Sequence, residues 1–435
     1  HEGGERPNLL LYVIDTLRAD HTSLYGYERR TTPRLEALAG EGILFDPAWA
    51  NASWTRPGTA TLLTGTLPSA HGAMNTLSLL SPDVELLSQT LQAAGYATHA
   101  VVTNPNLRGR WGLDRGWDEY RYIDLDLRFT DSSAVLNREV VPRLAELATA
   151  GKPFFLYLHS MDPHAPYQPP VGYRQYLDPD YEGPVDGSME SVRRLLAELR
   201  RDGAEAHAAD LEQLYGLYDG GILHNDARIG ELVDALESHG LLESTAILVT
   251  SDHGEEFFEH GGVMHGHSLY QEQIRIPMLL RPPGGVAPRR VGGAQQVDVA
   301  VMLAALAGVA PAPTMIGRDL SASGDADARP VFSEEELRDR RLWSLVEDGM
   351  KLHYNRNARH AEYQRQETRE LFDLAADAGE TDNLYRSRPV VAGYLRERAR
   401  TLAAGLATGA PSEMIDPEEL SDELRGQLRA LGYLQ

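Results

Sequence analysis

Short apolar runs alternate with helical stretches along most of this sequence. The run from Pro7 to Ile14 is apolar at nearly every position, which is typical of a strand buried on both faces of a sheet. Strands that alternate with helices indicate a mostly parallel sheet with helices on both faces. Similar strand-like runs recur at 43–45, 98–102, 154–159, 246–250 and 277–280, and helical spacing occurs at 32–40, 81–95, 188–239 and 299–306. The sequence therefore predicts an α/β fold with a large, mostly parallel central sheet flanked by helices.

The pattern changes after a stretch of small and polar residues at 321–329, which is typical of a linker. Beyond it, short strand-like segments separated by charged turns predict a small antiparallel sheet, and a helix is expected over 389–406. These segments lie at 331–332, 342–347, 351–354 and 370–374. We predict a large α/β domain over residues 1–325 and a small C-terminal α+β subdomain over residues 326–435.

The composition excludes several kinds of protein and of site. With 435 residues, 42% of them hydrophobic, and no apolar run of about 18 residues, the chain is expected to form a large domain plus a smaller one without a membrane span. It contains no cysteine, which excludes disulfides, thiolate metal sites and a cysteine nucleophile. The net charge of −23 argues against nucleic acid as a partner, because phosphate backbones require a basic surface.

The chain starts at His1 without an apolar leader, so an export signal has either been removed or was never present. We expect a periplasmic or secreted location rather than a cytoplasmic one. The sequence leaves the oligomeric state open.

The stretch from Asn51 to Gly65 joins a polar turn to a run of small, helix-compatible residues. Pro57 favours the first turn of a helix, so Thr55 is predicted at a helix start, where unpaired backbone N–H groups attract an anion. A hydroxyl held there can attack a bound phosphoryl or sulfuryl group. The alternative is that Thr55 only caps the helix through its hydroxyl oxygen.

Carboxylates and an imidazole follow two of the predicted strands. Asp15 ends the first strand, and Asp252 and His253 follow the strand at 246–250. Because ligand groups collect at the carboxyl ends of strands in open α/β sheets, we expect these side chains to converge with Thr55 on one cation. Two carboxylates, one imidazole and one hydroxyl suit Zn²⁺ or Mn²⁺ better than Ca²⁺. For Asp15 alone, the alternative is a turn or helix-cap residue.

A second group of polar side chains lies in loops rich in histidine and glycine, and it consists of Asp162, His164, His265 and His267. These residues are predicted to hold a second metal ion, or to bind substrate oxygens and protonate the leaving group, with His164 and His265 in the catalytic role. The alternative is that loop histidines are merely exposed, and we expect this of His260.

The motifs resemble those of the sulfatase family, within the alkaline phosphatase superfamily. The resemblance extends over nearly the whole chain, in segments 8–20, 51–72, 162–167, 251–276, 298–320 and 370–384. It implies the fold of that superfamily and a metal-dependent enzyme that hydrolyses a small anionic ester. It also implies that His71 forms a hydrogen bond near Thr55, as the comparable histidine does in sulfatases.

The chain departs from sulfatases at the nucleophile. Sulfatases carry Cys or Ser there, then Pro two residues on and Arg two further, and the matching residues here are Thr55, Pro57 and Thr59. Sulfatases convert that Cys or Ser to formylglycine, an aldehyde that Thr cannot yield because its β-carbon carries a methyl group. Residues 101–107 replace the Gly-Lys-Trp-His segment of the family, and His265 stands where sulfatases carry Lys. We therefore do not expect formylglycine chemistry.

What remains resembles the phosphodiesterases and phosphotransferases of the superfamily that use a Thr nucleophile. An Asp, the Thr and an Asp-His pair bind their first metal, and the matching residues are Asp15, Thr55, Asp252 and His253. Their second metal typically uses an Asp with a His four residues on, plus a distant His. Asp162 and His164 are only two residues apart, so this chain departs from that spacing.

These features predict a metal-dependent phosphoesterase, acting on phosphate diesters or monoesters, with Thr55 as its nucleophile. Asn104 is expected to contact a non-bridging oxygen of the substrate; the alternative is a loop-turn residue. Two other activities stay open. One is hydrolysis of a sulfate ester without formylglycine, for which a single bound metal would argue. The other is transfer of a phospho-group to a lipid or glycan.

Overall fold

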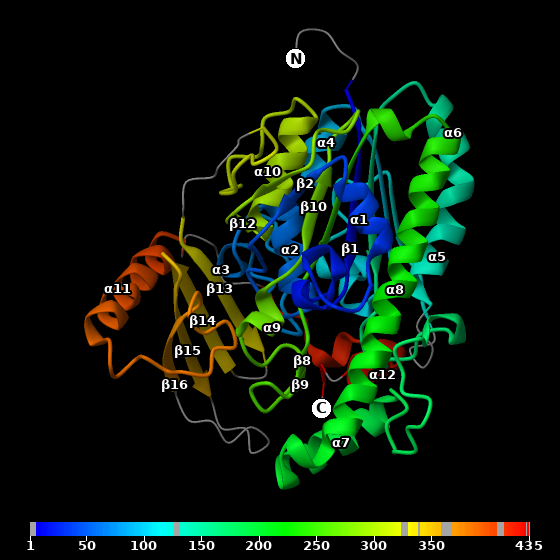
Figure 1. Ribbon diagram of the computed structural model, residues 1–435. Helices are drawn as coiled ribbons and strands as arrows, with labels where there is room; N and C mark the ends of the chain where they lie inside the picture. Colours follow the sequence, from blue (N-terminus) through cyan, green and yellow to red (C-terminus); the bar gives the residue numbers. More distant parts are fainter. Residues whose placement is uncertain are drawn as a thin grey trace.

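The computed structural model describes residues 6–125, 131–322, 329–337, 340–357, 368–406, 413–431 and 433–434. A sheet of eight strands with helices on both faces forms its centre, and a four-stranded antiparallel sheet with one long helix lies beside it (Figure 1). The predicted α/β fold with a smaller antiparallel sheet and helix is confirmed.

Strand β1 (Asn8–Ile14) lies inside the central sheet and is buried along its whole length. It pairs in parallel with β6 (Phe154–Ser160) on one side and β7 (Thr245–Ser251) on the other. Leu9, Leu11 and Val13 face one hydrophobic core, and Leu10, Tyr12 and Ile14 face the second. This two-sided burial explains why the run is continuously apolar instead of alternating.

The predicted strands recur in the sheet, with short additional ones at its edges. The order is β11 (Arg289–Val291), β2 (Ile43–Phe45), β10 (Met278–Arg281), β7, β1, β6, β4 (Ala97–Val102) and β5 (Glu119–Tyr122). β10 is antiparallel to its neighbours β7 and β2, and the other pairings of this sheet are parallel. The carboxyl ends of β1, β6, β4 and β7 therefore lie at one edge.

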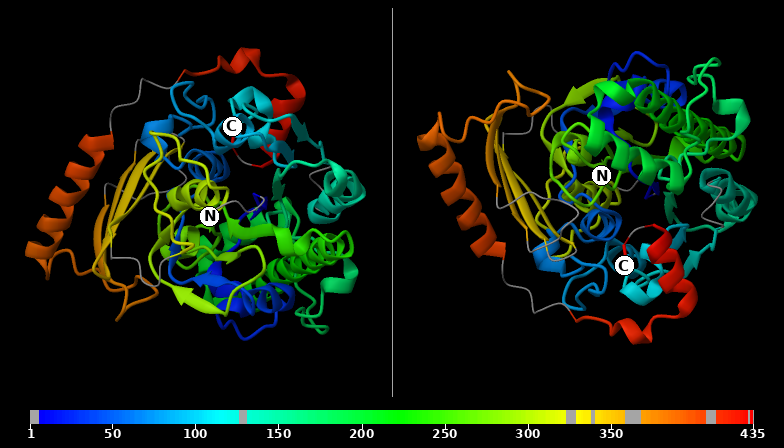
Figure 2. Two further views of the ribbon diagram at one scale, coloured as in Figure 1. Left: turned by 90° about the horizontal axis from the view of Figure 1, so that it is seen from above. Right: turned by 90° about the horizontal axis from the view of Figure 1, so that it is seen from below.

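Helices cover the two faces of the sheet (Figures 1 and 2). One face carries α2 (Thr55–Thr64), α4 (Leu87–Ala93) and α10 (Gln296–Leu306), and the other carries α1 (Pro33–Ala39), α5 (Ser132–Val140) and α8 (Ala208–Ser238). The smaller elements are α3 (Pro68–His71), α6 (Leu144–Thr149), α7 (Met189–Asp202), α9 (Gln271–Ile274), β3 (Ala48–Trp49), β8 (Glu256–Phe257), β9 (Val263–Met264) and β12 (Ala294–Gln295). None of the described helices is both long and apolar enough to cross a bilayer.

The helix predicted over 81–95 is shorter in the structure. It begins only at Leu87, because the Ser81 hydroxyl accepts a hydrogen bond from the Asp83 N–H and holds a turn ahead of it. The helical stretch predicted over 188–239 is divided into α7 and α8, and Gly203 follows the last residue of α7.

The antiparallel sheet contains β13 (Val331–Leu337), β14 (Arg340–Glu347), β15 (Met350–Asn357) and β16 (Thr368–Asp373), in that order. Helix α11 (Pro389–Leu406) packs on this sheet through Ala392, Leu395 and Ala399. Most of the predicted linker, residues 323–328, lies outside the described part of the chain. The division at residue 325 stays a prediction.

The chain then returns to the large α/β unit. Helix α12 (Asp422–Ala430), which the sequence analysis missed, buries Leu424 and Leu428 in a cluster that contains Trp54 and Trp111. Figure 2 shows this red helix beside the blue and cyan segments, apart from the orange α11. The last described residues thus come to the end of the molecule where the parallel strands end (Figure 1).

His260 was expected at the surface, and the structure corrects this. Its side chain is 11% exposed and stacks on Tyr270 with the ring centroids 3.6 Å apart. Its Nδ1 lies 2.6 Å from Glu272 Oε1, and its Nε2 lies 3.2 Å from the Glu380 carbonyl oxygen. His260 therefore joins the large unit to the segment that follows β16.

This contact predicts a pH-dependent contribution to stability. Burial lowers the pKa of His260. The hydrogen bond and charge of Glu272, together with the charge of Glu256, outweigh the effect of burial and raise the pKa to about 9. Because an unfolded histidine titrates near about pH 6.5, protonated His260 stabilises the fold fully below that pH, and this stabilisation is lost as the pH rises through about 9. The free energy of unfolding of wild type minus that of His260→Gln is expected to shrink by about 1–2 kcal/mol between the two values. Urea titrations at several pH values measure it, and a difference that stays constant with pH contradicts the assignment.

Candidate active site

Asp15 extends β1 by one residue and carries its carboxylate to the strand end. Its backbone N–H donates to the Ser160 carbonyl oxygen at 2.9 Å, and the next residue, Thr16, has a φ of 60°. A threonine in this left-handed region is uncommon, so the sharp turn there is held by surrounding contacts. One of them is the Thr16 N–H, which donates to Asp252 Oδ1 at 3.3 Å.

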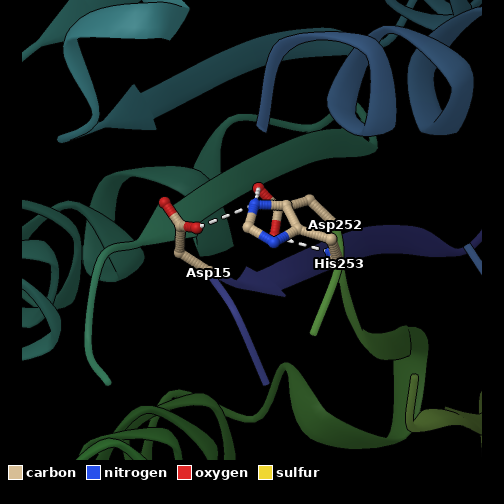
Figure 3. Close-up of side chains that lie close together, drawn as sticks. All are labelled: Asp15, Asp252 and His253. Atoms are coloured by element: carbon tan, nitrogen blue, oxygen red, sulfur yellow. Dashed lines mark hydrogen bonds and ion pairs between the residues drawn. The ribbon is translucent and has the colours of Figure 1, made fainter. Parts of the chain in front are cut away.

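Asp15, Asp252 and His253 form a compact, fully buried group (Figure 3). One ligand atom from each lies within 4.8 Å of the other two. His253 Nε2 is 3.4 Å from Asp15 Oδ1 and 3.6 Å from Asp252 Oδ2. His253 Nδ1 lies 2.9 Å from the Gly254 carbonyl oxygen, which fixes its proton on Nδ1 and leaves Nε2 to face the carboxylates.

The electrostatics of this group favour a cation. Burial raises the pKa of Asp15, but the charge of His164 and the hydrogen bond to His253 outweigh it and bring the pKa to about 2. Burial lowers the pKa of His253, and the charges of Asp252 and Asp15 outweigh it and bring the pKa to about 9. Asp15 Oδ1 is buried, and its contact with His253 Nε2, at 3.4 Å, is too long for a strong hydrogen bond. The donor set therefore fits one divalent metal ion.

Thr55 is the first residue of α2, a helix whose ten residues are all buried. Its Oγ1 lies 3.4 Å from His253 Nε2 and 3.4 Å from Asn104 Nδ2. A close approach at Gly58 sets this position: a Cβ there would lie 2.4 Å from the Asp252 carbonyl oxygen. The missing side chain of Gly58 lets α2 pack directly against the end of β7.

Asn104 follows β4, and its side chain links Thr55 to Asp15 of the buried candidate metal group. Its amide donates to Asp15 Oδ2 at 2.7 Å, and its side-chain oxygen accepts from the Asn106 N–H at 2.9 Å. The sequence predicted a substrate contact for Asn104 and, as the alternative, a loop-turn residue. The contact with Asn106 is that of a turn residue, and the substrate contact stays a prediction. His159, in β6, was missed; its Nε2 lies 3.2 Å from Asp252 Oδ2.

His265 lies next to His253, with the ring centroids 4.3 Å apart. Its Nδ1 is 2.9 Å from Glu255 Oε1, and its Nε2 is 2.8 Å from the hydroxyl of Tyr433. Burial raises the pKa of Glu255 to about 8, against the charge of His253. Glu255 thus orients His265, a role that the sequence did not indicate.

His164 is buried beside His265, with 5.0 Å between the ring centroids. Its Nδ1 lies 2.5 Å from the Ala165 carbonyl oxygen. Its Nε2 is buried without a hydrogen-bond partner in the described structure, so it is available to a ligand.

The other members of the second predicted group point elsewhere. Asp162 accepts hydrogen bonds from the N–H and hydroxyl of Ser133, at 2.9 and 2.6 Å. His267 Nε2 lies 2.7 Å from Glu256 Oε2. In the described part of the chain, these side chains do not come together with His164 and His265 as one compact ligand group.

His71, predicted to form a hydrogen bond near Thr55, is the last residue of α3 and contacts α2 at Thr61 instead. Its Nε2 is 3.1 Å from Thr61 Oγ1, and its Nδ1 accepts from the Ala73 N–H at 3.2 Å. Burial lowers the pKa of His71 to about 3, so the ring is neutral. The contacts of His71 therefore stabilise the packing of α2 in the core, at a position away from Thr55.

Tyr433 is the most distant residue of the site in sequence. Its hydroxyl lies 3.4 Å from Thr55 Oγ1, and its ring centroid lies 5.5 Å from that of Trp54. Burial raises the pKa of Tyr433 well above its usual range, so the hydroxyl keeps its proton. No local motif marked this residue.

Comparisons with known proteins show the family and the fold. The N-acetylglucosamine-6-O-sulfatase of Bacteroides thetaiotaomicron is 23% identical over 467 residues, which cover 88% of this chain and 83% of the relative. The uncharacterized sulfatase YidJ of Escherichia coli is 24% identical over 363 residues, covering 73% of this chain and 71% of that one. The crystal structure of a phosphonate monoester hydrolase from Agrobacterium radiobacter superposes with a TM-score of 0.73 at 21% identity, over 92% of this chain and 96% of that one. The family model described as sulfatase matches residues 7–309, and the chain therefore belongs to the sulfatase family.

Proposed function

We propose that the protein is a metal-dependent hydrolase of singly charged phosphorus esters, such as phosphodiesters or phosphonate monoesters, with Thr55 as its nucleophile. One observation carries this proposal: the Thr55 hydroxyl lies 3.4 Å from His253 Nε2, at the edge of the buried group of Asp15, Asp252 and His253. Homologues named sulfatases and a phosphonate monoester hydrolase with the same fold support an ester hydrolase in general.

The number of ligand groups supports a singly charged substrate. At this edge of the sheet, the described side chains offer one compact group of carboxylate and imidazole ligands, which suits one cation. A phosphate monoester carries close to two negative charges at neutral pH, whereas a diester or a phosphonate monoester carries one. One cation and few other positive groups therefore suit the singly charged ester better.

Asp15, Asp252, His253 and Thr55 would hold the metal. When bound, it would lower the pKa of the Thr55 hydroxyl and balance the charge on the non-bridging oxygens. Asn104 Nδ2 holds Asp15 and lies within reach of the same oxygens. The first N–H groups of α2 add a favourable field for the anion.

The reaction has two halves. In the first, the Thr55 hydroxyl releases its proton to solvent, Oγ1 forms a bond to phosphorus, and the bond from phosphorus to the alcohol oxygen breaks. His265, oriented by Glu255, gives a proton to the departing oxygen. In the second half, His265 takes a proton from a water molecule, the water oxygen forms a bond to phosphorus, the bond from phosphorus to Thr55 Oγ1 breaks, and the acid product is released.

A sulfate monoester is the second candidate, because it also carries one negative charge and the relatives in sequence are named as sulfatases. Turnover of four p-nitrophenyl substrates distinguishes the two: the bis-phosphate diester, the phenylphosphonate, the phosphate monoester and the sulfate. The protein is stripped with a chelator and reloaded with Zn²⁺, Mn²⁺ or Ca²⁺, and metal is counted by mass spectrometry.

We expect about one metal ion per chain, with Zn²⁺ or Mn²⁺ preferred. The diester or phosphonate is expected to turn over at least about tenfold faster than the phosphate monoester. Asp252→Asn should lose the metal and the activity together. Turnover of the sulfate alone would replace the first candidate with the second, and a protein that binds no metal would contradict both.

A further inference from the structure

The residues of the proposed reaction are closed off from solvent. Thr55, Asp15, Asp252, His253 and Asn104 are each 0% exposed. An ester must bring its phosphorus within about 3–3.5 Å of Thr55 Oγ1 before attack. Part of the structure must therefore move before a substrate can reach the nucleophile.

Tyr433 occupies the space that the reaction needs. Its hydroxyl is 3.4 Å from Thr55 Oγ1, the same separation that the reacting phosphorus requires. The same hydroxyl binds His265 Nε2 at 2.8 Å, which is the atom that must protonate the leaving group. With Tyr433 in this position, its hydroxyl contacts both the proposed nucleophile, Thr55, and the proposed proton donor, His265.

The segment that carries Tyr433 is attached by one apolar face and a few polar contacts. Leu420, Leu424 and Leu428 pack against a cluster that includes Trp54 and Trp111. At its rim, Arg108 contacts Glu423 at 2.9 Å and Gln427 at 2.8 Å. The contact with Glu423 is exposed, and an exposed ion pair contributes little to stability.

No strand of the segment pairs with the central sheet among the described residues, and α12 has only nine residues. The segment can therefore detach while the sheet, α2 and the metal group stay folded, because local opening costs less than global unfolding.

We propose that residues 417–431 and 433–434 belong to a displaceable cover over the active site, held shut by Tyr433, and that substrate binds only after the cover opens. This rests on the proposed function, in which Thr55 is the nucleophile. The apparent dissociation constant of an ester then equals its intrinsic value divided by the fraction of molecules that are open. Loosening the cover raises affinity, whereas removing a catalytic group lowers turnover.

The chain has no cysteine, so Thr55→Cys creates a single thiol at the covered position. Its alkylation by iodoacetamide reports access to residue 55 and requires no substrate. We expect slow alkylation in Thr55→Cys alone. A rate at least about tenfold higher is expected when Leu428→Ala is added or residues 431–435 are removed.

Leu395→Ala in α11 is the matched control, because Leu395 is equally buried but packs on the antiparallel sheet. It should leave the alkylation rate unchanged. Thermal unfolding of each variant checks that the fold is intact. Equal rates in all variants, whether uniformly fast or uniformly absent, would contradict a displaceable cover even if the enzyme hydrolyses phosphorus esters.

A second measurement separates a cover from a catalytic tyrosine. In the otherwise native enzyme, Tyr433→Phe removes the bonds to Thr55 and His265 and keeps the ring against Trp54. We expect KM for the diester to fall several-fold, with kcat within about twofold. A large loss of kcat without a lower KM would overturn the proposal. If no variant hydrolyses any ester but the alkylation rates differ as expected, the proposed function fails and the cover stands.

Discussion

Replacing Thr55 with alanine is expected to lower kcat for the diester by at least about a thousandfold, because the covalent half-reaction loses its nucleophile. Metal content should stay close to that of wild type, since Asp15, Asp252 and His253 keep their contacts with one another. Thr55→Ser keeps the hydroxyl on the same helix and is expected to retain activity within about tenfold. Steady-state kinetics and metal analysis of the three proteins measure these effects.

Thr64→Ala provides the control for helix α2. Thr64 is also fully buried, but its hydroxyl donates to the Ala60 carbonyl oxygen within the helix. It should alter stability and leave the kinetics unchanged. A Thr55→Ala protein with wild-type turnover would show that another group attacks the ester, and the proposed mechanism would be wrong.

Gly58→Ala is expected to have the second largest effect. The new Cβ would lie 2.4 Å from the Asp252 carbonyl oxygen, so α2 or the end of β7 must shift. Overpacking of this kind destabilises a core by about 1–3 kcal/mol. Because a displacement of about 1 Å at a catalytic group can cost a hundredfold in rate, kcat should fall by about that factor.

Gly393→Ala in α11 is the matched control, since a Cβ there meets nothing within 4 Å. It is expected to stabilise the protein by about 0.5–1 kcal/mol and to leave kcat unchanged. Differential scanning calorimetry and kinetics on both variants test the pair. Normal activity in Gly58→Ala would mean that the spacing between α2 and β7 does not set the position of Thr55.

The parts of the fold that could be predicted are those with a strong local pattern. β1 and β7 are continuous apolar runs because both faces of the sheet are covered. β5, with the sequence Glu-Tyr-Arg-Tyr, was missed because it is a short, partly exposed edge strand. The direction of β10 could not be predicted, because a four-residue apolar run carries no information on which way it pairs.

The same distinction applies to the candidate site. Asp15, Asp252 and His253 stand directly after strands, and the structure brings them together with Thr55. Glu255 was visible in the sequence, but its role depends on the turn that brings His265 back to it.

Helix α12 did carry a local signal: Ser421 caps its N-terminus, and Leu424 and Leu428 are spaced by one turn. The position at which α12 and Tyr433 pack could not be predicted, however, because it depends on contacts between parts of the chain that are far apart in sequence.

The residues of the site are far apart in sequence, and their separations indicate the order in which the site can assemble. Thr55 meets His253 across 198 positions of sequence and Tyr433 across 378. Contacts at such separations form late, because the chain must first lose the entropy of a long loop. During synthesis, Thr55 is made long before Asp252 and His253 at the end of β7. A chain synthesised only as far as α2 therefore has Thr55 in place but lacks both Asp252 and His253 and the Tyr433 segment that covers it.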